Sequence, residues 1–314
     1  MVGFDIGGTK CAVCVGHVED DKLIITDKKS FLNEKNDTYT DTINKMCSLA
    51  ESMTDDLSLI GISCGGPLDS KKGVIMSPPN LPGWDNVHIV DELRARYGGN
   101  VYIQNDANAC AVAEWLYGAG KGYSNVVFLT FGTGLGAGLI LDGKLYTGTN
   151  DMAGEVGHIR LDKFGPVGYG KMGSFEGFCS GGGIARLGEM MALESLQMGK
   201  SVSYCPTVAD LGNITAKLIA ERANAGYEDA VSVYRKCGEK LGFGLSVIID
   251  ILNPEAVIIG SVYQRCEHLL RDSAMDVIRA EALPHAAKVC KILPAQLSEN
   301  IGDYAALSVA AMNI

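Results

Sequence analysis

Two glycine-rich turns, far apart in the chain, could hold phosphate groups. Glycines leave backbone N–H groups bare and accept positive φ angles, and a concave row of N–H groups suits phosphate oxygens. Each turn separates two apolar segments, so each is predicted to be a β-hairpin. The candidate ligands are Asp5, Gly7, Gly8, Thr9 and Lys10 in the first turn, and Thr130, Gly132, Thr133 and Gly134 in the second. Two such turns would grip a polyphosphate from both sides, which indicates nucleotide-dependent phosphoryl transfer.

A single glycine-rich hairpin is usually only a hairpin, so the alternative for each turn is purely structural. Neither turn is a Walker A loop or a good dinucleotide-binding fingerprint. The duplication favours phosphate binding, and so do the charged residues of the first turn. Asp5 could orient a magnesium ion through water, and Lys10 could add positive charge. Taken alone, Lys10 is better explained as a solvated strand residue.

Asp106 is the candidate general base. It follows a predicted strand over 101–104 and opens an alanine-rich segment that predicts a helix to about residue 117. An aspartate with an ordinary pKa of about 3.9 is ionised at neutral pH and can accept a proton from an attacking hydroxyl. Aspartate is also a favoured helix N-cap, and the pattern alone leaves base and cap equally open. Asn105 beside it could bind a polyol by hydrogen bonds.

Polar side chains elsewhere are natural partners for the vicinal hydroxyls of a sugar. Glu155 and His158 are three residues apart, and Glu176 follows in the same glycine-rich region. Asn80 lies in a proline-rich turn, where its amide would be exposed. The alternative is a set of surface polar residues in loops. A structural zinc needs about four ligands, and this region offers too few.

The elements that must position these residues alternate between strand and helix patterns. Residues 1–31 predict a meander of three strands, 38–54 a helix, 57–63 a buried strand and 303–312 a final apolar helix. Strands followed by helices, twice over, indicate an α/β protein of two similar halves.

Composition limits the function further. A length of 314 residues suits two domains, and a net charge of −10 argues against a nucleic-acid-binding surface. No apolar stretch approaches the ~20 residues that span a bilayer, so no membrane partner is expected. Ten scattered cysteines favour a reducing cytoplasm. Cys11 and Cys14 form a CxxC, but strand positions i and i+3 face opposite sides, which favours buried apolar roles over a metal or redox pair.

Together these residues resemble the ROK family of sugar kinases, part of the sugar kinase–Hsp70–actin superfamily. The resemblance covers nearly the whole chain, and its motifs keep the order of the family. The segments that carry it are Asp5–Lys10 (DIGGTK), Gly65–Pro67 (GGP), Asn80–Trp84 (NLPGW), Asn105–Ala109 (NDANA), Thr130–Gly136 (TFGTGLG), Glu155–His158 (EVGH) with Glu176, and Leu252–Gly260.

The resemblance implies a fold and a set of site residues. The fold is α/β, with two actin-like (ribonuclease H-like) domains flanking a nucleotide and sugar cleft. Residues 1–107 plus 295–314 would form a small N-terminal lobe and 108–294 a large C-terminal lobe. Asp106 becomes the implied base, ATP and Mg²⁺ the implied cofactors, and Gly260 lies beside the adenosine. The implied sugar ligands are Gly65, Asn80, Asn105, Glu155, His158 and Glu176.

The implied activity is an ATP-dependent hexose kinase, with the 6-hydroxyl of glucose as the expected acceptor. Within this class the rivals are a kinase for N-acetylmannosamine or N-acetylglucosamine, and a fructokinase. From another class, the rival is a catalytically silent sugar-sensing protein. We expect a hexose or N-acetylhexosamine substrate and a homodimer.

Three features depart from the family pattern or bear on its branches. Many members carry a CxCGxxGCxE segment whose cysteines bind a structural zinc, and here those positions are Val167, Tyr169 and Ser174. We therefore expect no zinc, and a loop held by packing. Gly260-Ser261 replaces the usual Gly-Gly. The family also includes repressors with an N-terminal DNA-binding domain, which we do not expect because the first phosphate turn starts at Asp5.

Overall fold

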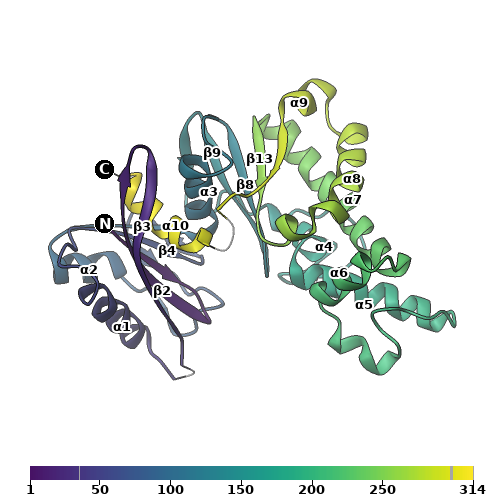
Figure 1. Cartoon of the computed structure of the whole chain (residues 1–314), viewed down its shortest axis with the longest axis horizontal. Helices are drawn as coiled ribbons and strands as arrows, with labels where there is room; N and C mark the ends of the chain where they lie inside the picture. The colour runs from purple at the N-terminus through teal and green to yellow at the C-terminus, as the bar shows by residue number, and fades with distance from the viewer. Residues whose placement is uncertain (35, 298–299, 314) are drawn as a thin grey trace. The chain divides into compact units, whose positions relative to one another are not determined.

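The computed structural model describes residues 1–34, 36–297 and 300–313, and it is a mixed α/β protein (Figure 1). The chain forms two compact units. The first unit is Met1–Phe128, Gly138–Ala153 and Gln296–Ile314, and the second is Leu129–Ala137 and Gly154–Ala295. The division into two actin-like lobes, residues 1–107 plus 295–314 and residues 108–294, stays a prediction.

The first unit contains a sheet with the strand order β3-β2-β1-β4-β7 among the described residues. Strands β1 and β2 and strands β2 and β3 pair antiparallel, which confirms the meander predicted for the N-terminus. Strands β1 and β4 and strands β4 and β7 pair parallel. The strands are β1 (Val2–Ile6), β2 (Lys10–Glu19), β3 (Lys22–Leu32), β4 (Leu59–Cys64) and β7 (Asn100–Asn105).

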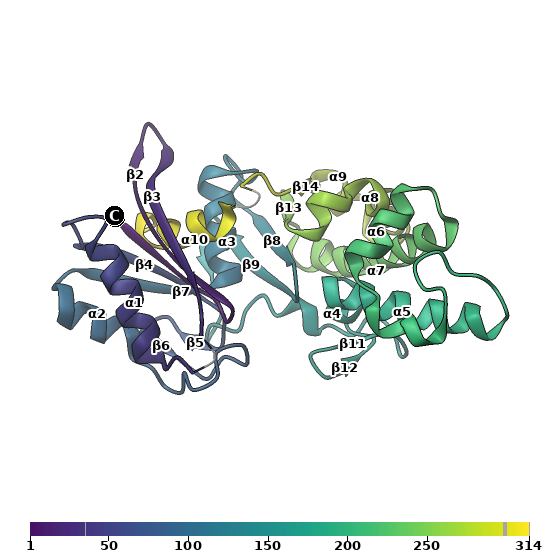
Figure 2. The same ribbon diagram turned by 60° about the horizontal axis from the view of Figure 1, so that its bottom comes forward.

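Helices cover both faces of this sheet. Apolar residues of α1 (Tyr39–Glu51) and α2 (Ile89–Tyr97) share one core cluster with alternate residues of β1, β2 and β4. On the other face α10 (Ile301–Ala311) packs on β1 and β4 and beside α3 (Asp106–Tyr117), as Figure 2 shows. This approach is close, because a Cβ at Gly3 would lie only 3.0 Å from the Leu307 nitrogen.

The two cysteines of the CxxC lie on opposite faces of β2. Cys11 belongs to the cluster with α1 and α2, whereas Cys14 packs with Leu307 of α10. Both side chains are buried, and all the cysteines of the described chain are free thiols. The predicted role as small buried apolar residues is confirmed.

The second sheet has the order β10-β9-β8-β13-β14, and the boundary between the units crosses β8 and β9. Its strands are β8 (Val126–Phe131), β9 (Leu135–Leu141), β10 (Lys144–Tyr146), β13 (Ala256–Ile259) and β14 (Lys291–Pro294). The helices of the second unit are α4 (Phe175–Phe178), α5 (Gly181–Gln197), α6 (Ala216–Asn224), α7 (Glu228–Leu252), α8 (Val262–Glu281) and α9 (Pro284–Val289).

Short elements complete the fold. They are β5 (Leu68–Asp69) and β6 (Val74–Ile75) in the first unit, and β11 (Val167–Gly168), β12 (Lys171–Met172), η1 (Val156–His158) and η2 (Val208–Asn213) in the second. Within the described ranges, no helix has both the length and the apolar character that crossing a bilayer requires.

A buried carboxylate ties α3 to the segment that leads into α10. Glu114 Oε1 accepts hydrogen bonds from the N–H groups of Gln296 (2.9 Å) and Leu297 (2.8 Å), and Oε2 accepts one from Ala119 (2.8 Å). We expect Glu114→Gln to lower the free energy of unfolding by about 1–3 kcal/mol, because the new amide nitrogen would face an N–H donor.

Urea denaturation of the Glu114→Gln variant would measure this loss. Glu92→Gln, an exposed change on α2, is the matched control and is expected to be nearly neutral. Equal stability of the two variants would mean that the carboxylate does not hold this segment.

Candidate active site

The first glycine-rich turn joins β1 to β2, and an asparagine fixes its orientation. Asn33 Nδ2 donates to the carbonyl oxygens of Gly7 (2.8 Å) and Gly8 (3.2 Å). In a trans peptide the C=O and the following N–H point in opposite directions. The N–H groups of Gly8 and Thr9 therefore point away from Asn33. Lys10, at the start of β2, is exposed.

Asn80 lies against this turn and against the end of β4. A Cβ at Gly8 would overlap the Asn80 carbonyl oxygen, so this approach requires glycine. A Cβ at Gly65 would lie 3.3 Å from Asn80 Nδ2, and one at Gly66 would lie 2.9 Å from Asn105 Nδ2. The two glycines after β4 thus bring the amides of Asn80 and Asn105 to one place.

The cap of α3 is Asn105, not Asp106. The Asn105 side chain accepts from the Ala107 N–H at 3.0 Å, and Asp106 is the first residue of the helix. Asp106 is solvent-accessible, and its Oδ1 also accepts from the Ala107 N–H, at 2.8 Å. Desolvation by the surrounding protein raises the pKa of the Asp106 carboxyl, while the Ala107 hydrogen bond acts in the opposite direction.

Asp5 lies among other carboxylates at the end of β1. Desolvation, followed by the charges of Asp303 and Asp106, raises the pKa of Asp5 to about 6. Asp303, in the first turn of α10, is itself buried and paired with Lys28 of β3. A Cβ at Gly302 would lie 2.6 Å from Asp5 Oδ2, so the start of α10 closes over this carboxylate.

The second glycine-rich turn joins β8 to β9. Thr130 Oγ1 accepts a hydrogen bond from the Gly136 N–H (2.9 Å), so the Thr130 side chain connects the two strands of the hairpin. The Gly132 N–H donates to the Gly134 oxygen (3.1 Å), and the Gly132 oxygen accepts from Gly181 at the start of α5 (2.7 Å). Thr133 lies at the tip of the turn and is exposed.

Gly260 and its neighbour border the same turn. The Gly260 N–H donates to the oxygen of Leu129 in β8 (3.0 Å), which sets the end of β13 beside the turn. Ser261 then has a positive φ of 55°, and a Cβ at Gly132 would lie 3.6 Å from its Oγ. The Gly260-Ser261 departure therefore places a hydroxyl beside the second turn.

Glu176 connects the sugar-type residues to the second turn. Its Oε2 accepts from the N–H of Leu135, the first residue of β9, at 3.1 Å. A Cβ at Gly134 would lie 2.8 Å from the same oxygen. Glu176 is held in the short helix α4, whose N-cap Ser174 accepts from the Gly177 N–H. One carboxylate oxygen is thus committed to the turn.

The Glu155–His158 segment packs on the start of β9. A Cβ at Gly157 would overlap the Leu135 oxygen and would lie 3.3 Å from Glu176 Cβ. Only glycine permits this contact, which sets η1 beside Glu176. Glu155 and His158, on either side of Gly157, are both exposed.

The segment without the expected cysteines is held by hydrogen bonds and ring contacts. Arg160 Nη1 donates to the Met172 oxygen (2.7 Å), and Lys171 Nζ donates to the His158 oxygen (2.7 Å). The rings of Tyr169 and His158 make an edge-to-face contact, with their centroids 6.5 Å apart. Within residues 1–34, 36–297 and 300–313, no group of three or more His, Cys, Asp or Glu residues could hold a metal ion.

We expect the purified protein to contain far less than one zinc per chain. The positions of the zinc thiolates are Val167, Tyr169 and Ser174, and Ser174 is used as a helix cap. Elemental analysis measures the zinc directly. Treatment with EDTA followed by excess Mg²⁺ should restore the initial activity. About one zinc per chain after extensive dialysis would contradict this expectation.

The structure gathers the predicted residues into one group in each unit. In the first unit, the turn at 7–10 lies with Asp5, Gly65, Asn80, Asn105 and Asp106; in the second, the turn at 130–134 lies with Glu155, His158, Glu176 and Gly260. Sequence reasoning missed Asn33 and Asp303. Neither belongs to a motif, and both are more than 20 residues from the groups that they contact.

Sequence similarity to known proteins extends over nearly the whole chain. A family model described as ROK family matches residues 1–312. The glucokinase of Thermotoga maritima is 29% identical over 313 residues, which are 98% of this chain and 96% of that protein. The glucokinase of Halalkalibacterium halodurans is 31% identical over 307 residues, 96% of this chain and 92% of that protein.

A solved glucokinase structure and a transcriptional repressor are also similar to this chain. The crystal structure of a ROK family glucokinase from Streptomyces griseus, in complex with glucose and AMPPNP, matches with a TM-score of 0.76 at 29% identity and 99% coverage of both chains. This likeness confirms the predicted α/β fold of two actin-like domains. The xylose repressor of Bacillus spizizenii is 26% identical over 306 residues, 95% of this chain and 73% of the repressor.

Proposed function

The chain belongs to the ROK family, and from this we propose that it is an ATP-dependent hexose kinase with Asp106 as its general base and the 6-hydroxyl of glucose as its acceptor. The observation that carries the proposal is that Asn105 and Asp106 have different roles at the start of α3. Asn105 supplies the cap, so the accessible Asp106 carboxylate is available to a substrate. The glucose bound to the Streptomyces griseus relative supports the choice of sugar.

The proposed phosphate contacts come from the two turns. The N–H groups of Gly8 and Thr9 point away from Asn33. In the second turn the Gly132 N–H donates to the Gly134 oxygen, so the proposed donors there are the N–H groups of Thr133 and Gly134. ATP is the proposed phosphoryl donor, because a related structure holds the ATP analogue AMPPNP. Gly260, at the end of β13, is the proposed neighbour of the adenosine.

Asp5 is the residue that would hold Mg²⁺, through water. The fit rests on charge: burial is the main cause that raises the pKa of Asp5 to about 6, and repulsion by the Asp303 and Asp106 carboxylates adds to the rise. A dication would relieve this repulsion. When bound, Mg²⁺ neutralises the charge on the phosphates during transfer.

Each unit by itself offers candidate sugar contacts. Asn80 and Asn105 offer amides and Gly65 a backbone approach in the first unit; Glu155, His158 and Glu176 offer acceptors and a donor in the second. A carboxylate that receives a sugar hydroxyl must be oriented beforehand. The Leu135 N–H orients Glu176 in this way.

The proposed chemical step is an in-line transfer of the γ-phosphoryl group to the sugar. The sugar oxygen attacks the γ-phosphorus in line, a P–O bond forms, and the bond from that phosphorus to the bridging oxygen breaks to release ADP. Asp106 accepts the proton of the hydroxyl as its oxygen attacks. The raised pKa of this carboxyl makes it a better proton acceptor than an ordinary aspartate.

A coupled ADP-release screen tests the proposal. The screen covers glucose, mannose, fructose, N-acetylglucosamine and N-acetylmannosamine, each with Mg–ATP, and a calorimetric titration measures sugar binding in parallel. We expect turnover with glucose above all others. Turnover with an N-acetylhexosamine or with fructose would correct the substrate. Sugar binding without turnover would replace the kinase by a sugar-sensing regulator, the role that the likeness to a xylose repressor suggests.

A further inference from the structure

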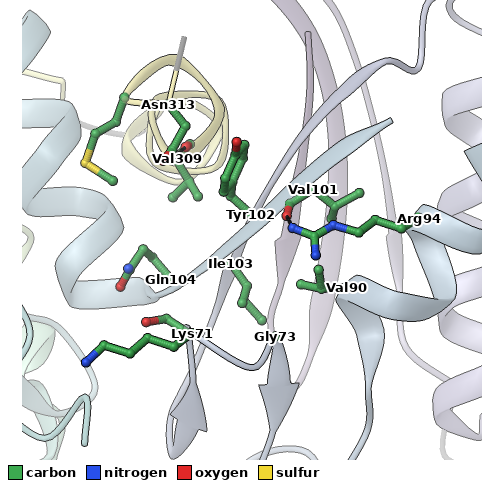
Figure 3. A pocket seen from close by; sticks show the side chains of 12 residues that line it. Lys71, Gly73, Val90, Arg94, Val101, Tyr102, Ile103, Gln104, Val309 and Asn313 are labelled. Carbon is green, nitrogen blue, oxygen red and sulfur yellow. Dashed lines mark hydrogen bonds between the residues drawn. The ribbon is translucent and has the colours of Figure 1, made fainter. Parts of the chain in front are cut away.

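A pocket of about 300 Å³ lies at the open edge of the first sheet (Figure 3). Four parts of the first unit line it: the β5–β6 hairpin, α2, β7 and the C-terminal end of α10. None of the lining residues is among those assigned above to the sugar, the phosphates or the magnesium ion. The pocket is therefore a separate candidate binding site.

Backbone groups of β7 face this pocket. The Asn100 N–H donates to the Ser58 oxygen (2.8 Å), on the side of β4, whereas the Val101 oxygen accepts from Arg94 Nη2 (2.9 Å) on the opposite side. Along a strand, successive residues turn their N–H and C=O groups to alternate sides. The N–H groups of Val101 and Ile103 consequently point to the open edge, where they can donate to a ligand.

The side chains of the pocket are rich in donors and cationic. Lys71 and Arg94 are the charged side chains among the described lining residues, although the chain as a whole carries a net charge of −10. Arg94 uses one Nη2–H on Val101 and keeps further N–H groups. Gln104 Oε1 accepts from Asn108 Nδ2 (3.4 Å), which leaves the Gln104 amide nitrogen as a donor. Such a lining suits a ligand that is an anion and a hydrogen-bond acceptor.

The remaining walls and the size limit the ligand further. Val90, Ile103 and Val309 give the pocket apolar surface. Its volume is at the lower end of the roughly 300–1,000 Å³ that small-molecule sites occupy. We propose that this pocket binds a small organic anion, a carboxylate or a phosphate ester, and that its occupancy regulates the phosphoryl-transfer site.

The route to that site is short. Gln104 directly precedes Asn105 and Asp106, and its bond to Asn108 reaches the first turn of α3. Asn108 is buried, and its Oδ1 has no hydrogen-bond partner among the described residues, so the contact with Gln104 is what holds this amide. An anion that engages the Gln104 amide changes how the start of α3 is held. This coupling rests on the proposed kinase function; the pocket itself does not.

Binding is tested by calorimetry on the full chain, with glycerol 3-phosphate and succinate as separate probes. We expect at least one of them to bind with a Kd of about 1 mM or lower. Which one binds separates a phosphate ester from a carboxylate. Arg94→Gln and Lys71→Gln should each weaken that binding about tenfold or more. Lys72→Gln, a change of the neighbouring lysine that bonds Asp69 instead, is the matched control.

Two results would overturn the site. One is the absence of binding by both probes, or equal binding by wild type and the Arg94 and Lys71 variants. The other is strictly competitive displacement of the probe, in which the apparent Kd of the probe keeps rising in proportion to the AMPPNP concentration; this would assign the anion to the phosphate turns.

Regulation is tested in the kinase assay. We expect the bound probe to change the KM for sugar at least about twofold, and Gln104→Leu to remove this change while the probe still binds. Binding without any change in kcat or KM would overturn the coupling. A chain that turns over no sugar would refute the kinase function, and calorimetry would still show whether the pocket binds an anion.

Discussion

The Asp106→Asn variant should lose about 10²–10⁴-fold in kcat, roughly 3–5 kcal/mol of transition-state stabilisation, while sugar and ATP still bind. The amide keeps the size of the side chain, and its oxygen can still accept from the Ala107 N–H that Asp106 contacts. The helix is not expected to suffer, because its cap is Asn105. The amide cannot, however, accept the proton of an attacking hydroxyl. Steady-state kinetics and calorimetry together separate these two effects.

Asp91→Asn is the matched control, since Asp91 also lies in the first turn of a helix, at an exposed position of α2. It should leave kcat unchanged. A near-normal kcat in Asp106→Asn would assign Asp106 a purely structural role and would end the general-base proposal.

The Asp5→Asn variant should become more stable than the wild type above pH 6 in the absence of Mg²⁺, although it loses activity. The folded-state pKa of Asp5 is raised from 3.8 to about 6, so the folded chain holds a proton that the unfolded chain releases. This stabilisation is complete below pH 4 and disappears as the pH rises through 6. The shift corresponds to about 3 kcal/mol, and partial exposure reduces our expectation to about 1–2 kcal/mol.

Thermal denaturation from pH 4 to pH 8 measures this effect. The asparagine side chain of the Asp5→Asn variant has no charge to desolvate, so its stability curve should lack the fall between pH 4 and pH 6. We expect kcat to fall at least about 10²-fold, because the carboxylate proposed for Mg²⁺ is gone. Asp55→Asn, an exposed change of the same charge, is the control. A variant less stable than wild type at pH 8 would mean that Asp5 is a net stabilising group.

Much of the fold could be predicted because its signals are local. The helix predicted over 38–54 is α1, with Thr38 as its cap, and the strand predicted over 57–63 is β4. The residue pattern does not predict strand β14 or helix α9. β14 is a short strand of four residues that pairs parallel with β13, more than 30 residues earlier in the chain. Pairing of that kind depends on distant residues and has no local pattern.

The sequence could not show which of two neighbouring residues, Asn105 or Asp106, caps α3. Both Asn105 and Asp106 are residue types that cap helices, and the pattern left the roles of Asp106 equally open. The structure assigns the cap to Asn105, because the helix begins at Asp106 and the Ala107 N–H donates to Asn105 Oδ1. The non-helical backbone angles of Asn105, at the end of β7, set this start.

The two glycine-rich hairpins, the order of the motifs and the family could be predicted from the sequence, because turn chemistry and residue spacing are local features of the chain. Which groups share a local environment depends on how distant segments fold together. Asp303 lies close to Asp5 because α10 packs on the first sheet, and Glu176 accepts from the Leu135 N–H where Gly157 lets η1 approach β9. Such contacts join segments up to about 300 residues apart, and desolvation and Coulomb interactions depend on distance in space, not on separation along the chain.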